Sequence, residues 1–527
     1  MRTGRTTGLV GLVLVGLVFG GICGLAQEDE QDVISVAFRA DPGSLDPAAS
    51  QPTNNTWFIW YQTYERLCKA DHEDINKLVP VLATAWEAND AADEWTFQLR
   101  QGVTFSDGTA MDADAVKYTF TRLMAINLGP SAWYTDLVDS IEVVDPYTVT
   151  FHLNRGYSVF PNLLSAMDAG YIVSPTAFQA HATDDDPWAS QWAKGNVVGT
   201  GPYRITEWVR GQVIILRKNE NYWGGWEGEH FDGIDFRIAL EDSSRKLGMQ
   251  SGTFDYAEDI NYTDIPSLQN DPDLDLYLNT TTQLWMIILN NQRPPLDNVK
   301  VRQALSYAYP YEASIDLIFM GYAKQAIGPS NTGLLYHNPN LTQYTENLAK
   351  AQELLDESGI DPTDYTLELS YVAGLDFERR MAEAFQGNLS QLGFKVELRA
   401  APWASLVSMF EQEPVERPHM GVYYNAPDFN DPFTQTFEPI YETGQAWNWA
   451  AHSDPQYDAL LEQAFTETDP DKLQALAYEL QEILVDNAVN IYISEGLQVS
   501  ATGTDIGGYY SIPFYGGIAY IYDMYRK

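Results

Sequence analysis

Thr366-Leu-Glu-Leu-Ser-Tyr-Val372 begins the stretch of sequence that determines the fold class of this chain. Residues 377–392 and then Phe394-Lys-Val-Glu-Leu-Arg399 complete it. The first and last pieces have the composition and alternation of β-strands, and the middle piece has the apolar spacing of a helix that ends at Gly393. A strand, a helix and a strand within about thirty residues make a βαβ unit, with a parallel strand pair and a right-handed crossover. The sequence therefore predicts a mixed α/β fold.

The flanking sequence continues with helices and strands of the same mixed kind. Asp112 is placed to cap the N-terminus of one helix, and Asp469-Pro470 supplies an N-cap and a first-turn proline for another. Ile491–Ile493 is predicted as a strand, and Trp95–Leu99 with Val103–Phe105 is predicted as a hairpin. We find no repeat, low-complexity tract or coiled coil, so we expect several α/β lobes without a long flexible linker.

The composition limits the classes of partner that the protein can bind. The chain has 527 residues, of which 45% are hydrophobic, and its 31 Lys+Arg against 73 Asp+Glu give a formal charge of −42. That length suggests about three domain-sized lobes. The acidity argues against a nucleic-acid partner, because phosphate binding needs clustered basic side chains, and it disfavours anionic membranes. The simplest interpretation is a solvated acidic surface, although a saline habitat is an alternative that one sequence leaves open.

The first 26 residues have the three parts of a secretory signal peptide. Arg2 and Arg5 form a positive start, residues 8–22 are an uncharged apolar run, and Gly24-Leu-Ala26 places small residues at the cleavage positions. The apolar run is too short for a stop-transfer helix. We therefore expect removal of residues 1–26 and a periplasmic mature protein, whose charge of −42 becomes −44 without the two arginines.

The two cysteines exclude a disulfide framework. Cys23 would be the lipidated first residue if the signal were of the lipoprotein type, but the preceding Ile22 is bulky where a small residue is needed. We therefore expect no lipid anchor at Cys23. Only Cys68 then remains, and one thiol cannot form an intrachain disulfide. Because no later apolar run reaches membrane-spanning length, we expect a soluble mature protein.

The sequence contains no catalytic or metal-binding signature. The seven histidines are scattered, and there is no HExxH, zinc-type Cys/His set, Walker loop or GxSxG elbow. Asp107, Asp112 and Asp114 superficially resemble a calcium loop, but their spacing departs from the EF-hand pattern and fits a turn and a helix cap better. We predict no catalytic residue, no metal site and no cofactor, which favours binding over catalysis.

Two segments resemble a known family: Val198-Gly-Thr-Gly-Pro-Tyr-Arg-Ile-Thr-Glu-Trp208 and Ile214-Ile-Leu-Arg-Lys-Asn-Glu-Asn-Tyr-Trp-Gly224. They resemble the signature of the extracellular solute-binding proteins of family 5, the oligopeptide/dipeptide-binding proteins of ABC importers. Further matches follow in the same order as in the family: Ser44-Leu-Asp-Pro47, Tyr64-Glu-Arg-Leu67, Pro80 to Trp86, Trp95 to Gly108, and Val301 to Ala308. Each piece alone fits an ordinary turn and strand, whereas their ordered occurrence covers essentially the whole mature chain.

The resemblance implies an α/β fold of the large, class II periplasmic-binding-protein type, with two lobes around a cleft and an extra domain inserted in the first. Carried onto this chain, lobe I comprises about 32–68, 197–288 and 495–527, the extra domain about 69–196, and lobe II about 289–494.

The same resemblance places two crossings between the lobes. One falls at Asn290 to Leu296 and the other at Ser494 to Gly496. We predict that Asn290, Leu296, Ser494 and Gly496 belong to hinges, which absorb backbone rotation as the lobes close on a ligand. The alternative is that these are ordinary loops.

Ala426-Pro-Asp-Phe-Asn-Asp-Pro432 is the segment that bears most on the ligand. Asp428 falls on the aspartate that, in peptide-binding relatives, pairs with the α-ammonium of the bound peptide. A carboxylate in a closed, dry cleft is costly unless a cation is delivered to it. The resemblance therefore implies a peptide with a free N-terminus, held in an extended form by backbone hydrogen bonds. The alternative for Asp428 is a turn aspartate ahead of Asp431-Pro432.

One departure from the family pattern lies beside this aspartate. Relatives usually have a Trp three residues before it, where this chain has Asn425, with Tyr423 and Tyr424 just upstream. We expect Tyr423, Tyr424, Asn425 and Phe429 to accompany Asp428 in the ligand site.

Three functional hypotheses remain at this stage. The first is a monomeric receptor that captures short peptides and delivers them to the membrane permease subunits of an ABC importer. The second is the same fold binding an oligosaccharide, a nickel chelate or another solute; sugars stack on exposed aromatic rings, and this chain is 13% aromatic, with clusters at Trp57–Tyr64, Trp133-Tyr134 and Trp447/Trp449. Most such rings belong to cores in any large protein. The third hypothesis is a secreted hydrolase, which would turn its ligand over.

Overall fold

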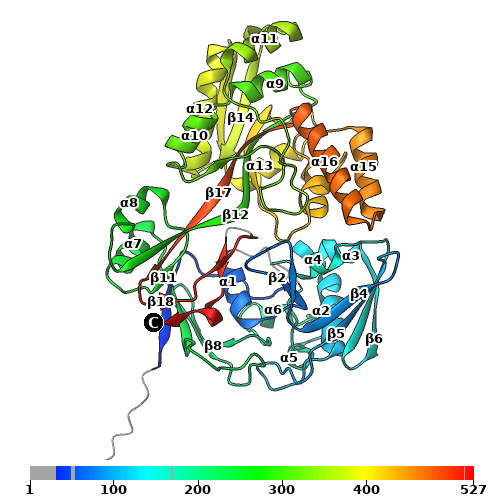
Figure 1. The fold of residues 1–527 in the computed structure, drawn as a ribbon, viewed down its shortest axis with the longest axis vertical. Coiled ribbons are helices and arrows are strands. Elements are labelled where there is room, and N and C mark those ends of the chain that lie inside the picture. The colour runs from blue at the N-terminus through cyan, green and yellow to red at the C-terminus, as the bar shows by residue number, and fades with distance from the viewer. Residues whose placement is uncertain (1–30, 49–53, 168–169, 515–516) are drawn as a thin grey trace, which may run out of the picture.

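The computed structural model describes residues 31–48, 54–167, 170–514 and 517–527. The predicted signal peptide and Cys23 therefore lie outside the described residues. Figure 1 shows two lobes, one above the other, with the long strands β12 (Leu274–Leu289) and β17 (Asn490–Gly503) running between them. The prediction of a mixed α/β fold with two lobes is confirmed.

One large mixed sheet runs through both lobes. Its strands follow in the order β15 (Lys395–Ala401), β14 (Thr366–Val372), β16 (Met420–Asn425), β12, β17, β11 (Tyr256–Ala257), β1 (Val33–Phe38), β10 (Gly233–Ile238), β9 (Val213–Lys218) and β8 (Tyr203–Val209), and β13 (Lys324–Gln325) pairs with β17. The β15 end of this sheet lies in the upper lobe and the β8 end in the lower lobe (Figure 1). Because β12 and β17 pair over most of their length, two long antiparallel strands connect the lobes.

A separate four-stranded sheet lies in the lower lobe, on the side away from the main sheet (Figure 1). Its order is β4 (Ala83–Ala88), β5 (Glu94–Leu99), β7 (Thr148–Leu153) and β6 (Val138–Asp145). Three short pairs complete the strands: β2 (Cys68–Ala70) with β3 (Leu78–Pro80), β18 (Ile506–Gly507) with β21 (Tyr525–Arg526), and β19 (Ser511–Ile512) with β20 (Ile518–Ala519).

The helices cover these sheets. Those of the lower lobe are α1 (Asn54–Thr63), α2 (Ala113–Ile126), α3 (Ala132–Thr135), α4 (Phe160–Leu164), α5 (Pro175–His181), α6 (Ser190–Ala193), α7 (Asp242–Gln250) and α8 (Ile265–Leu268). Those of the upper lobe are α9 (Val299–Ala308), α10 (Tyr311–Leu317), α11 (Leu348–Ser358), α12 (Asp376–Gln391), α13 (Trp403–Phe410), α14 (Glu438–Tyr441), α15 (Pro455–Thr466) and α16 (Pro470–Asp486). None of the helices in the described ranges combines the length and apolar character needed to cross a membrane.

The upper lobe has two cores, one on each face of its sheet. Successive side chains of a strand point to opposite faces, so β12 contributes to both cores. Ile287 and Leu289 pack into the core that also contains α9, α11 and α12, whereas Leu284, Met286 and Ile288 pack into the core with α13, α15 and α16. This double burial explains why the β12 sequence is apolar at consecutive positions here.

The βαβ prediction is confirmed. β14 and β15 are parallel, with Leu367 opposite Val396, and α12 connects them. Asp112 caps α2 by accepting a hydrogen bond from the Ala115 N–H, and Asp469 caps α16 in the same way. Both caps satisfy N–H groups that the first helical turn leaves unpaired.

The predicted hairpin of Trp95–Leu99 with Val103–Phe105 is wrong. β5 pairs instead with β4 and β7, and Val103–Phe105 contains no strand. The segment folds into a loop in which the Phe105 N–H donates to the Thr109 carbonyl at 2.8 Å. Val103 and Phe105 are both buried in the core around the four-stranded sheet. Their apolar alternation therefore reflects a loop anchored in a core rather than strand pairing.

Two glycines of the segment 198–208 allow its backbone to approach the end of α1. A Cβ on Gly199 would lie 2.3 Å from the Thr63 carbonyl oxygen, and one on Gly201 would lie 2.6 Å from the Thr63 carbonyl carbon. The Gly201 N–H instead donates to the Thr63 carbonyl at 3.1 Å. These glycines serve close packing between α1 and the segment that leads into β8.

Candidate functional site

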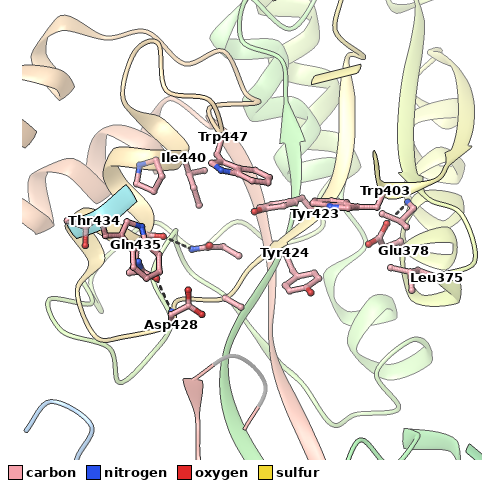
Figure 2. A pocket seen from close by; sticks show the side chains of 15 residues that line it. Leu375, Glu378, Trp403, Tyr423, Tyr424, Asp428, Thr434, Gln435, Ile440 and Trp447 are labelled. Carbon is pink, nitrogen blue, oxygen red and sulfur yellow. Dashed lines mark hydrogen bonds between the residues drawn. The ribbon is translucent and has the colours of Figure 1, made fainter. Parts of the chain in front are cut away.

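A cavity of about 540 Å³ is lined mostly by residues of the upper lobe, together with Trp133 of the lower-lobe helix α3. Figure 2 shows the side chains around it. They come from the ends of upper-lobe strands, from upper-lobe helices and loops, and from one lower-lobe helix. The residues are Trp133, Val372, Leu375, Glu378, Trp403, Tyr423, Tyr424, Asn425, Ala426, Asp428, Thr434, Gln435, Pro439, Ile440 and Trp447.

The topology of the sheet explains the position of this cavity. β14 is parallel to both β15 and β16, so the carboxyl ends of all three strands meet at one edge. Val372 ends β14, Asn425 ends β16, and Trp403 begins α13 shortly after β15. In open α/β sheets, ligands bind in the crevice outside the carboxyl ends of the strands.

The loop after β16 carries Asp428 into the wall of the cavity. Asp428 is 7% exposed, and its N–H donates to Gln435 Oε1 at 2.9 Å. Gln435 belongs to a π-helical turn, Phe433–Phe437, that follows the loop. π-Helical turns are rare and are frequently found at functional sites.

The same loop is fixed to the lower lobe. The Met167 N–H donates to the Asp428 carbonyl at 3.3 Å, and the Asn430 amide donates to the Ile75 carbonyl at 3.1 Å. The Tyr157 hydroxyl donates to the carboxylate of Asp431. Asp428 therefore sits on a segment of the upper lobe that contacts the lower lobe at Asp428 itself and at the residues that follow it.

Aromatic rings form a second part of the wall. Trp403 lies nearly parallel to Trp447, with ring centroids 6.3 Å apart and 17° between the planes, and nearly parallel to Tyr423 at 6.4 Å and 12°. Trp403 and Trp447 are 45% and 44% exposed. Large, half-exposed indoles at a cavity provide apolar and cation-binding faces.

Glu378 is a second carboxylate in the wall. It lies in the first turn of α12, is 2% exposed, and its Oε2 accepts a hydrogen bond of 2.6 Å from the Val372 N–H. Burial raises the pKa of Glu378 to about 7, against the lowering effect of that hydrogen bond. Figure 2 shows Glu378 and Asp428 apart from each other, with Tyr424 between them in this view.

Most of the residues predicted for the ligand site lie together. Tyr423, Tyr424, Asn425 and Asp428 line the cavity. Phe429 does not: its ring is fully buried and packs edge-on against Trp133, at 5.4 Å, within the core around the four-stranded sheet. Phe429 therefore anchors the loop in this core and does not line the cavity.

The predicted aromatic clusters divide in the same way. Trp133 and Trp447 line the cavity, whereas Tyr134 and Trp449 are buried in cores. The cluster Trp57–Tyr64 forms the buried helix α1 and the turn after it. Glu378, Trp403 and Gln435 were not predicted; the signal for the first two was their place just after the strands of the βαβ unit.

The predicted hinge residues lie in two different settings. Gly496 lies in β17 opposite a break in the pairing with β12, between Thr280 and Leu284. Ser494 pairs with Trp285, next to a second register shift between Trp285 and Met286. Asn290 and Leu296 are fully buried beyond the end of β12: the Asn290 amide donates to Pro418 at 3.3 Å, and Leu296 packs in an upper-lobe core. Both residues therefore lie within the upper lobe, and the crossing at Asn290 to Leu296 stays a prediction, as does the hinge role of all four residues.

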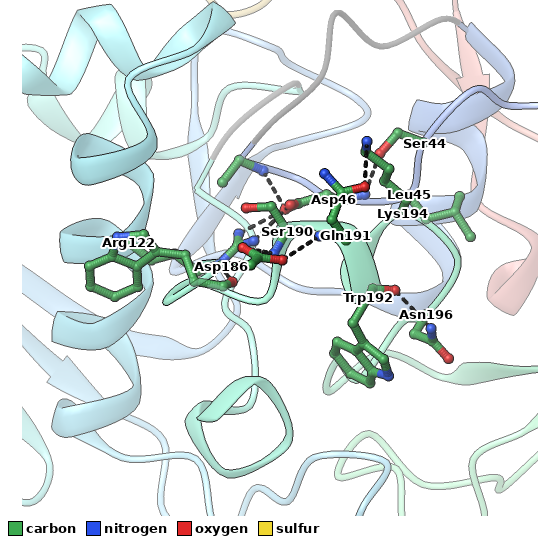
Figure 3. Close-up of polar contacts among 12 residues, drawn as sticks. Ser44, Leu45, Asp46, Arg122, Asp186, Ser190, Gln191, Trp192, Lys194 and Asn196 are labelled. Atoms are coloured by element: carbon green, nitrogen blue, oxygen red, sulfur yellow. Dashed lines mark hydrogen bonds and ion pairs between the residues drawn. The ribbon is translucent and has the colours of Figure 1, made fainter. Parts of the chain in front are cut away.

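The Ser44–Pro47 segment lies away from the cavity and stabilises the lower lobe. Figure 3 shows the Asp46 carboxylate facing the Arg122 guanidinium of α2, with two hydrogen bonds of 2.7 Å. Both side chains are buried, and Arg122 also donates to the Trp188 carbonyl at 2.9 Å. Bidentate pairing of this kind compensates for burying two charges.

No metal centre is found in the described ranges, which contain no group of three or more His, Cys, Asp or Glu side chains arranged to hold an ion. Cys68 is buried, and burial raises the pKa of its thiol to about 12. A thiol of this kind is unreactive.

The family model for bacterial extracellular solute-binding proteins, family 5 Middle, matches residues 77–472. The chain belongs to this family. The solute-binding protein is 28% identical over 485 residues to the probable D,D-dipeptide-binding periplasmic protein DdpA of Escherichia coli, with 91% of each chain covered. It is also 28% identical over 449 residues to the glutathione-binding protein GsiB of Pectobacterium atrosepticum, covering 83% of this chain and 84% of that one.

Its fold matches solved structures of the same class. The structure of HbpA2 from Haemophilus parasuis superimposes with a TM-score of 0.82 at 25% identity, covering 94% of this chain and 100% of that chain. The class II periplasmic-binding-protein fold is thus confirmed. The protein is a solute-binding component of an import system and not an enzyme, which sets aside the hydrolase hypothesis.

Proposed function

We propose that this solute-binding protein captures short peptides with a free N-terminus in the 540 Å³ cavity and delivers them to a membrane permease. The observation that carries the proposal is the position of Asp428, a buried carboxylate in the cavity wall. The names of the relatives support it, since DdpA is a probable dipeptide-binding protein and GsiB binds glutathione, itself a peptide.

Asp428 supplies the charge that an α-ammonium requires. A buried carboxylate gains most from a cation that arrives with its own hydrogen-bond donors. The cavity volume falls within the range of about 300–1,000 Å³ typical of small-ligand sites. The aromatic wall would receive ligand side chains without requiring one particular shape.

Closure of the lobes would take place at the break between Thr280 and Leu284, which Gly496 faces, and at the second register shift, which lies next to Ser494. A register break interrupts the ladder hydrogen bonds, so the two strands bend there at lower cost than elsewhere.

We further propose a monomer in the periplasm, exported by residues 1–26 and without a lipid at Cys23.

Mass spectrometry of the ligand that co-purifies with the protein tests the peptide proposal, together with thermal-shift screening of short peptides. A ligand at 100 times its Kd adds about 2.7 kcal/mol to the free energy of unfolding, which a shift in Tm reveals. Peptides should stabilise the protein and sugars should not. Stabilisation by sugars alone would contradict the proposal.

An oligosaccharide is the second candidate ligand. The observation in its favour is the set of nearly parallel rings of Trp403, Trp447 and Tyr423, on which sugar rings could stack. Such binding would not depend on a ligand ammonium, so Asp428→Asn would leave it nearly unchanged.

A further inference from the structure

The charges in the cavity wall are of one sign. Glu378 and Asp428 are both carboxylates, and the described residues that line the cavity include no lysine, arginine or histidine. The two acids come from separate elements, the first turn of α12 and the loop after β16. Figure 2 shows their side chains apart, so they are two acidic positions in one cavity and not a single acidic pair.

The arginines of the two adjoining cavities already have partners. Arg39, in a cavity of about 280 Å³ that shares Tyr424 with the main one, forms an ion pair of 3.0 Å with Asp259. Arg155, in a cavity of about 330 Å³, lies 4.0 Å from the ring centroid of Phe465. Arg245 also lines the cavity of Arg39, and it forms an ion pair with Asp242. None of these three arginines leaves a free cation that faces Glu378 from an adjoining cavity.

A ligand with one ammonium would satisfy only one of these acids. With its α-ammonium at Asp428, it would leave Glu378 with the Val372 N–H as its hydrogen-bond donor. A buried carboxylate with a single donor is costly to keep ionised. A second cation on the ligand would remove this cost, and the half-exposed face of Trp403 in the same wall would receive its alkyl stem or guanidinium plane.

We propose that Glu378 determines the specificity of the cavity by selecting ligands with a second cationic group. The substrate class would be short peptides that carry a lysine or arginine side chain in addition to the free α-ammonium; this class rests on the proposed peptide-binding function. Glutathione carries a net negative charge, so its carboxylates would face two acidic side chains in a cavity wall whose described lining has no basic side chain to pair with them. This protein would then differ in specificity from its glutathione-binding relatives.

Isothermal titration calorimetry of the mature protein tests the role of Glu378. The ligands are Ala-Lys-Ala and Ala-Ala-Lys, each with its glutamine counterpart. The wild type should bind the better lysine peptide about tenfold more tightly than the counterpart. Glu378→Gln should reduce this ratio to about one, with little change for the glutamine peptide. Glu383→Gln, an exposed acid on the same helix, is the matched control and should keep the ratio.

The outcomes separate this inference from the proposed function. An equal ratio in the wild type, or an unchanged ratio in Glu378→Gln, overturns the role of Glu378 while peptide binding stands. If the wild type binds none of the peptides, the proposed function fails. In that case 1,5-diaminopentane decides the inference: binding that is lost in Glu378→Gln supports selection of a dication, and absence of binding overturns it.

Discussion

Replacing Glu378 with glutamine should make the ligand-free protein more stable, and more so at higher pH. The folded state holds the proton of Glu378 with a pKa of about 7, against an ordinary value of 4.5. The folded state thus binds more protons than the unfolded chain between these values, so stability falls as the pH rises through them. The cost of the native glutamate is about 1 kcal/mol at pH 5 and about 3 kcal/mol at pH 8.

Glutamine removes the charge and keeps the acceptor. Its amide oxygen can accept the hydrogen bond that the Val372 N–H now donates to Glu378 at 2.6 Å. Urea unfolding of the wild type and of Glu378→Gln, followed by tryptophan fluorescence at pH 5 and pH 8, measures the difference in free energy. Glu383→Gln serves as the control, because Glu383 is exposed and forms a surface ion pair with Arg379. Such pairs contribute only about 0–1 kcal/mol.

A stability difference that is the same at both pH values, or a loss of stability in Glu378→Gln at pH 8, would contradict the proposed cost of ionising Glu378. Either result would mean that the carboxylate is ionised at little cost in the empty cavity. The proposed need for a second ligand cation would then lose its physical basis.

Three other predictions concern the scaffold and the cavity wall. Arg122→Met removes the guanidinium from the buried Asp46 carboxylate, so urea unfolding should show a loss of about 3–5 kcal/mol, and a loss below about 1 kcal/mol would contradict this. Gly201→Ala places a Cβ 2.6 Å from the Thr63 carbonyl carbon, so its free energy of unfolding should fall by about 1–3 kcal/mol in the same assay; an unchanged value would show that the contact relaxes freely. Trp403→Ala removes a half-exposed indole of the cavity wall, so calorimetry should show peptide affinity reduced about tenfold with little change in Tm, whereas unchanged affinity would exclude this ring from the site.

The sequence was most informative where local pattern and final burial agree. β14, α12 and β15 were predicted because each has one clear periodicity and Gly393 ends the helix. The hairpin at Trp95–Leu99 failed because Val103 and Phe105 are apolar for a different reason, as loop residues anchored in a core. Alternation over three residues does not distinguish these two environments.

The candidate site was predicted only in part. Asp428 and its neighbours were found because they lie in one short segment that resembles the family. Glu378 and Trp403 come from elements far from Asp428 in sequence, and only the parallel order of β15, β14 and β16 brings them to the same edge. The register break opposite Gly496 is a property of strand pairing, which has no local signature.

The central claim is that Asp428 pairs with the free α-ammonium of a bound peptide. Titration calorimetry with one peptide, with and without an N-terminal acetyl group, tests it most directly on the wild type and Asp428→Asn. We predict that acetylation weakens binding to the wild type by about a hundredfold and binding to Asp428→Asn hardly at all, since a buried charge-assisted hydrogen bond contributes about 1.5–3 kcal/mol. Equal affinity of the wild type for the free and the acetylated peptide would contradict the account.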